Sequence, residues 1–71
     1  MQTTCSDLAE VIEEAIDRFT LTVVLDAIEE VCDGKALHLA SDWQDVRSAK
    51  VWAQAARRID RIRGFASDHN I

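Results

Sequence analysis

Apolar residues recur at the spacing of an amphipathic α-helix over residues 7–19. The acidic residues of this segment fall on the opposite side, and Thr4 or Ser6 is suited to cap the start of the helix. We therefore predict a first helix over residues 7–19, preceded by a frayed leader at residues 1–5. The apolar stripe comprises Leu8, Val11, Ile12, Ala15, Ile16 and Phe19, and the acidic side comprises Asp7, Glu10, Glu13, Glu14 and Asp17.

A second apolar stripe runs from residue 21 to residue 40 and keeps its phase through Gly34. Because the phase survives, we predict one continuous helix over residues 21–40, capped by Thr20 or Thr22. Glycine costs a helix about 1 kcal/mol relative to alanine, so a break at Asp33-Gly34 is the alternative. The stripe comprises Leu21, Val24, Leu25, Ile28, Val31, Cys32, Ala36 and Leu39.

A third helix is predicted over residues 45–63, with Gly64 as its stop and residues 65–71 as a short tail. Its N-terminus is signalled either by Ser41 and Gln44, which fit an S-x-x-Q capping box, or by Asp45. Apolar residues cover more than half of its circumference, which is typical of a central helix with two neighbours. They are Val46, Ala49, Val51, Trp52, Ala53, Ala55, Ala56, Ile59 and Ile62.

These elements predict an all-α fold, since the chain lacks proline and has only two glycines to form the tight turns of a β-rich protein. At 71 residues the chain is long enough for a single domain, residues 1–71. The predicted architecture is a small three-helix bundle. Helices 21–40 and 45–63 form an antiparallel hairpin, and the first helix packs across it.

A core of this size seldom supplies more than about 3–5 kcal/mol, so we expect additional stabilisation. A disulfide is not expected, because Cys5 falls in the predicted leader and Cys32 in the second helix. There is also no cysteine–histidine cluster for a metal. Association with itself or with another chain remains, and a homodimer is the preferred prediction.

Charge is divided unevenly along a chain whose net charge is −5. Residues 1–45 hold eleven acidic and two basic side chains, whereas residues 46–71 hold six basic and two acidic ones. The two parts attract each other. An antiparallel fold or a symmetric dimer brings them together, which orients the helices more than it stabilises them.

Two features are candidates for binding a partner: Trp43 and a basic stripe on the third helix. Trp43 falls between two helices, where we favour a plug at the end of the bundle over an exposed anchor, and Trp52 is expected in the core. Basic residues on one side of a helix are also typical of a nucleic-acid-binding surface, but the net negative charge and the lack of interleaved aromatic residues oppose this interpretation. The basic residues are Arg47, Lys50, Arg57, Arg58 and Arg61.

No catalytic residue, cofactor, metal or small-molecule substrate is predicted. Cys32 and His38 lie about 9 Å apart along one helix and on different sides, so they form no dyad. Cys32 is expected to be buried and His38 to lie at the surface. There is no glycine-rich nucleotide loop and no Glu-x-x-His motif of a di-metal bundle. Val23 and Leu37 lie off the main stripe, either as exposed single residues or as part of a second interface.

The predicted function is therefore a non-enzymatic protein–protein interaction module: an adaptor, regulator or inhibitor that occupies a protein surface. A small nucleic-acid-binding regulator is the alternative. The acidic side of the first helix is either solvated or imitates a run of phosphates. Without a signal sequence or a membrane-spanning stretch, the predicted location is the cytoplasm.

Overall fold

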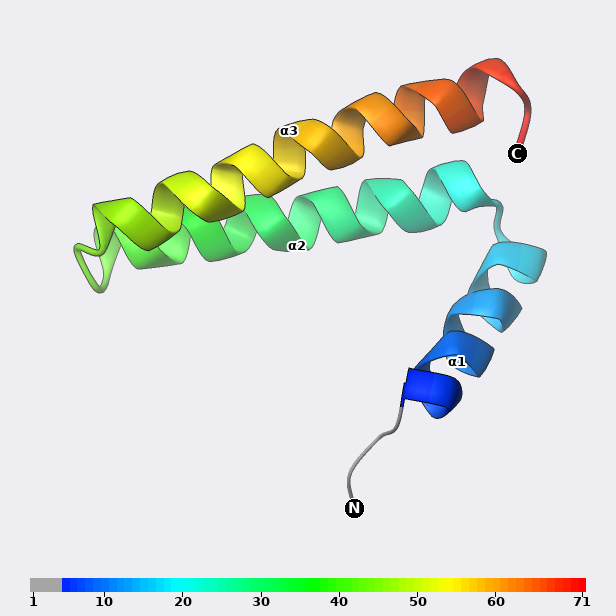
Figure 1. Ribbon diagram of the computed structural model, residues 1–71, viewed down its shortest axis with the longest axis horizontal. Coiled ribbons are helices and arrows are strands. Elements are labelled where there is room, and N and C mark those ends of the chain that lie inside the picture. Colours follow the sequence, from blue (N-terminus) through cyan, green and yellow to red (C-terminus); the bar gives the residue numbers. More distant parts are fainter. Residues whose placement is uncertain (1–4) are drawn as a thin grey trace.

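The computed structural model describes residues 5–71, which form three helices joined by short connections (Figure 1). The helices are α1 (Cys5–Arg18), α2 (Leu21–Ser41) and α3 (Val46–Asp68). Helices α2 and α3 pack against each other as an antiparallel hairpin. The predicted all-α fold is thus confirmed. Of the predicted frayed leader, residues 1–4 lie outside the described part of the chain, and Cys5 is already the first residue of α1.

Helix α2 is continuous through Gly34, as predicted. The Thr20 hydroxyl oxygen caps its start by accepting a hydrogen bond from the Val23 backbone N–H at 3.2 Å. The backbone N–H groups of Leu21 and Thr22 both donate to the carbonyl oxygen of Ile71. The end of the segment that follows α3 therefore also satisfies donors at the start of α2.

Alanine at either glycine is expected to stabilise the protein. Both Gly34 and Gly64 lie within helices, and a Cβ added at either position meets no atom within 4 Å. We expect Gly34→Ala and Gly64→Ala each to raise the free energy of unfolding by about 0.5–1 kcal/mol. Chemical denaturation followed by circular dichroism measures this. The matched change in the opposite direction, Ala40→Gly, should lower it, and an unchanged or lower stability of both alanine variants would contradict the expectation.

Asp45 caps α3 by accepting a hydrogen bond from the Ser48 backbone N–H at 3.1 Å. The capping box from Ser41 is wrong, because Ser41 is the last residue of α2 and its hydroxyl donates to the Leu37 carbonyl. Hydrogen bonds from the backbone and side chain of Ser48 lower the pKa of Asp45. A carboxylate with a lowered pKa stabilises the fold above its usual pKa. The cap is then lost as the pH falls through the lowered value.

Helix α3 continues through Gly64 to Asp68, so the predicted end at Arg63 and the predicted tail at 65–71 are wrong. Ala66 follows Ile59 by two helical turns on the side that faces α2, and it is fully buried. The stop comes at Asn70, which has a φ of 58°. The N–H of Ile71 donates to Ala66 and that of Asn70 to Ser67, as in a Schellman motif.

Small residues line the contact between α2 and α3. Cys32 is buried there, as predicted, together with Ala49, Ala56 and Ala66. Their short side chains let the two helix axes approach closely. Trp52 was expected in the core, but it is 37% exposed. Both Cys5 and Cys32 are free thiols, as predicted.

Helix α1 projects away from the hairpin, so that the molecule has the outline of an open V (Figure 1). It contacts α2 and does not approach α3. The prediction that the first helix packs across the hairpin is therefore wrong for a single chain. Only Phe19 and Thr20 separate α1 from α2, and Thr20 has a φ of 149°. The direction of the backbone at this connection points α1 outwards, and the molecule measures 38 × 37 × 14 Å.

Candidate functional site

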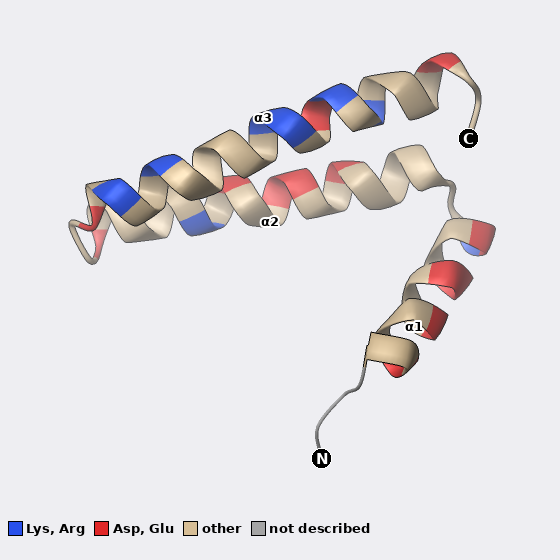
Figure 2. Cartoon of the chain, in the orientation of Figure 1, with Lys and Arg blue, Asp and Glu red and all other residues tan. Residues whose placement is uncertain are grey.

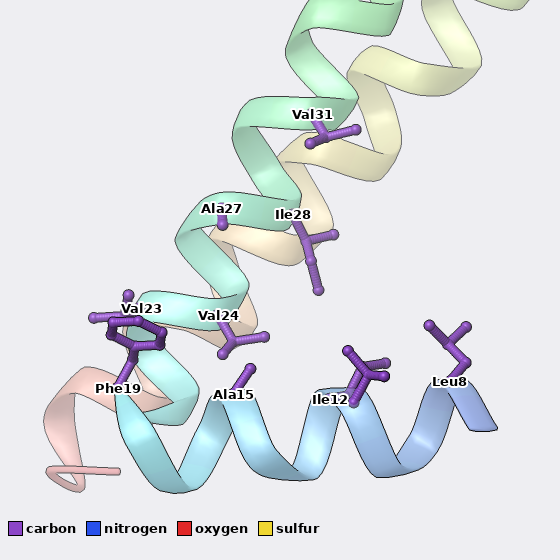
Figure 3. Close-up of a pocket in the computed structure, with 10 residues that line it drawn as sticks. Leu8, Ile12, Ala15, Phe19, Val23, Val24, Ala27, Ile28 and Val31 are labelled. Atoms are coloured by element: carbon purple, nitrogen blue, oxygen red, sulfur yellow. The ribbon is translucent and has the colours of Figure 1, made fainter. Parts of the chain in front are cut away.

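An apolar groove of about 530 Å³ lies inside the V, between α1 and α2. Leu8, Ile12 and Ala15 of α1 face the side of α2 that carries Val24 and Ile28 (Figure 3). Much of this lining is open to solvent: Val11 is 62% exposed and Val31 is 60% exposed. The groove is lined by Leu8, Val11, Ile12, Ala15, Phe19, Val23, Val24, Ala27, Ile28 and Val31.

The groove arises because α2 has two apolar sides. One side holds Cys32 and packs on α3, while Val24, Ile28 and Val31, spaced by four and three residues, line the groove. Val23, which lay off the predicted stripe, also lines it. Leu37 does not, and it stands 70% exposed outside the groove. Sequence periodicity had placed the residues of both sides of α2 on one stripe.

No charged residue lines the groove, and the acidic residues of α1 lie on its side away from the groove (Figure 2). The predicted basic stripe is present, and all five of its residues are exposed. Arg57, Arg58 and Arg61 gather with Gln54 around one shallow depression. Within the described part of the chain, none of the five stripe residues forms an ion pair. They are Arg47, Lys50, Arg57, Arg58 and Arg61.

Arg63, which the predicted stripe omits, points towards α2 instead. Its Nε lies 3.0 Å from the Glu29 carboxylate and 3.7 Å from that of Asp26, and its guanidinium also bonds to Asp60. The hydrogen bond to Asp60 and, to a smaller extent, the hydrogen bond to Glu29 raise the pKa of Arg63 above its usual value. Arg63 thus joins α3 to the acidic side of α2. The three-residue spacing of Asp60 and Arg63 was the available signal in the sequence.

Trp43 is 69% exposed, so the favoured prediction that it plugs the end of the bundle is wrong. Its indole N–H donates to Nε2 of His38 at 2.8 Å, and Nδ1 of His38 lies 2.6 Å from the Asp42 carboxylate. These two contacts hold the indole on the outside of the turn between α2 and α3. His38 lies at the surface, as predicted. The sequence signal for its pairing with Asp42 was the four-residue spacing.

The Asp42–His38 pair has the arrangement of a carboxylate that orients a general base, but its outer nitrogen is occupied. Nε2 accepts a hydrogen bond from an indole, which has no nucleophilic oxygen or sulfur to activate. Among residues 5–71, no three histidine, cysteine or acidic side chains lie close enough together to hold a metal ion. In the same range, no helix combines the length and apolar character needed to cross a bilayer. The groove is therefore the most distinctive surface of the described chain.

Comparisons with protein-family models, with curated protein sequences and with solved structures found no significant match to this chain.

Proposed function

We propose that the protein is a non-enzymatic protein–protein interaction module whose binding surface is the groove between α1 and α2. The observation that carries this proposal is the wholly apolar, uncovered lining of the groove, which comes from ten residues on two helices and the connection between them. Contiguous exposed apolar surface of this kind is uncommon on soluble monomers and marks interaction sites. A protein segment that presents an apolar face is its natural occupant.

A second exposed surface is available for an adaptor or regulator to use at the same time. Trp43 is held outward by His38, and tryptophan is enriched among the residues that dominate binding energies. The basic stripe on α3 lies on the side away from α2 (Figure 2). We therefore retain Trp43 and the stripe as candidate partner-binding residues beside the groove. The free thiols of Cys5 and Cys32 are compatible with a reducing compartment such as the cytoplasm.

Nucleic-acid binding, the alternative function, has the arginine depression on α3 as its support. No aromatic residue lines that depression for base stacking, and the net charge of −5 disfavours a phosphate backbone. The groove has the wrong chemistry for a nucleic acid altogether. Protein binding is therefore the function that we propose.

Val11→Asp tests the proposed function, because it places a carboxylate on the α1 wall of the groove without touching the contact between α2 and α3. Tagged protein is captured from an extract of its source cells. The wild type should retain at least one chain, either another copy or a different protein, that Val11→Asp loses. Burial of an unpaired charge in an apolar contact accounts for the loss. Quantitative mass spectrometry of the retained chains is the measurement.

Leu37→Asp is the matched control, since the Leu37 side chain is also exposed to solvent but lies outside the groove. It should retain the same chains as the wild type. If Val11→Asp also retained the wild-type set, or if the wild type retained nothing that depends on the groove, the groove would not be an interaction surface.

A further inference from the structure

We propose that the occupant of the groove is a second copy of this chain, in a two-fold dimer in which each copy lays α1 on the hairpin of the other. The inference rests on the proposed function, because it takes the groove to be an interaction surface. In such a dimer both copies use the same surface, so helix α1 of one copy and the groove of the other must be complementary. Both are apolar, and both belong to each chain.

The solvent-accessible surface of the single chain is larger than that of a compact monomer of the same mass. The accessible surface is 5879 Å², whereas a compact monomer of this mass exposes about 4,450 Å². Residues 1–4 contribute at most about 700 Å² as fully solvated chain, which leaves an excess of at least about 700 Å². A standard protein–protein interface buries about 800 Å² on each partner. The excess area therefore matches what one stable interface removes.

Helix α1 also needs support that its own chain does not supply. It has 14 residues, contacts only α2 and contains no buried residue. Isolated helices shorter than about 12–15 residues are marginal in water, and most helical stability comes from packing an apolar face. A neighbour that covers the α1 stripe supplies this packing.

Charge selects a second copy over an unrelated protein. Helix α1 carries five acidic residues and one arginine, whereas α3 carries six basic residues and two acidic ones. These helices do not approach each other within one chain. Exchange of α1 between two copies brings each acidic helix to a basic one, twice in the same dimer.

One side of α3 is suited to receive the partner's α1. Val51, Arg58 and Ile62 share that side because they are spaced by seven and four residues, and both apolar members are more than half exposed. An acidic helix that packs its apolar stripe on Val51 and Ile62 keeps most of its carboxylates on the outside, but Glu13 and Glu14 border the stripe and come to the edges of the contact, beside the basic residues of α3. The neighbouring exposed positions Arg47 and Arg61 extend this basic edge.

A charge-exchange experiment tests the proposed dimer. The first variant reverses α1 (Glu10→Lys, Glu13→Lys and Glu14→Lys), and the second reverses α3 (Arg47→Glu, Arg58→Glu and Arg61→Glu). All six positions are exposed in the single chain. Sedimentation velocity at micromolar concentration should give twice the chain mass for the wild type. Each variant alone should dimerise at least about tenfold more weakly, because like charges now meet at both contacts. An equimolar mixture should recover the wild-type affinity.

Several results would overturn the proposal: a monomeric wild type, variants that dimerise as the wild type does, or a mixture that stays as weak as its components. Circular dichroism checks that each variant keeps its hairpin. If a triple variant does not fold, the single change Glu14→Lys or Arg58→Glu is used in its place. The proposed function fails differently. If the wild type is monomeric but captures another protein that Val11→Asp loses, only the proposed dimer is refuted. If capture does not depend on the groove, the proposed function is refuted.

Discussion

Val31→Asp should abolish dimerisation of the purified protein and leave its hairpin intact. Val31 is 60% exposed in the single chain and lies on the α2 wall of the groove. In the proposed dimer a carboxylate at this position is enclosed by the apolar stripe of the partner's α1. Burial of an unpaired charge costs several kcal/mol, and each 1.4 kcal/mol is tenfold in affinity, so the dissociation constant should rise at least about 100-fold.

Sedimentation equilibrium should show the change as a fall from twice the 8.0 kDa chain mass to the chain mass itself. Leu37→Asp serves as the control, because it places the same carboxylate on the same helix outside the groove. Dimerisation of Val31→Asp with wild-type affinity would place the contact between copies elsewhere on the molecule.

Ala56→Asp should unfold the hairpin or come close to doing so. Ala56 is 3% exposed and lies where α3 packs on α2, so the new carboxylate has neither space nor a partner. A domain of this length is stable by only about 4–10 kcal/mol. A buried unpaired charge removes at least about 3 kcal/mol of that, which corresponds to a melting temperature lower by about 12–24 °C.

Thermal unfolding followed by circular dichroism at 222 nm measures this effect, since the signal at this wavelength reports helix. Gln54→Asp is the matched control, because it introduces aspartate two residues earlier on the exposed side of α3. It should melt close to the wild type. An Ala56→Asp variant with wild-type melting would show that α2 and α3 do not pack through Ala56.

The helices themselves could be predicted because their signals are local. An unbroken phase through Gly34 was sufficient to predict α2, and Asp45 was one of two recognised caps for α3. Gly64 misled the prediction because glycine is tolerated within a helix whenever the apolar phase continues, and here Ala66 continues it. The true stop depends on the left-handed backbone of Asn70 and two backbone hydrogen bonds, which no apolar pattern encodes.

The groove could not be predicted because periodicity identifies an apolar side but not what covers it. The stripe on α1 has the same pattern whether it packs on its own hairpin or on another chain. The choice depends on the direction that the backbone takes at Thr20, which is set by a single connection. Trp43 shows the same limit. Its outward position follows from hydrogen bonds among His38, Asp42 and Trp43, and these depend on the geometry of the turn.

In the proposed dimer, the projecting helix α1 also makes the lifetime of the protein depend on its abundance. Helix α1 leaves the ribosome before the hairpin does, and that hairpin leaves much of its apolar stripe uncovered. Until an occupant arrives, this segment unfolds at little cost and is open to proteases. Capture of α1 by another molecule is a second-order process, so newly made chains are protected sooner when their occupant is plentiful. Degradation would then remove the surplus that finds none.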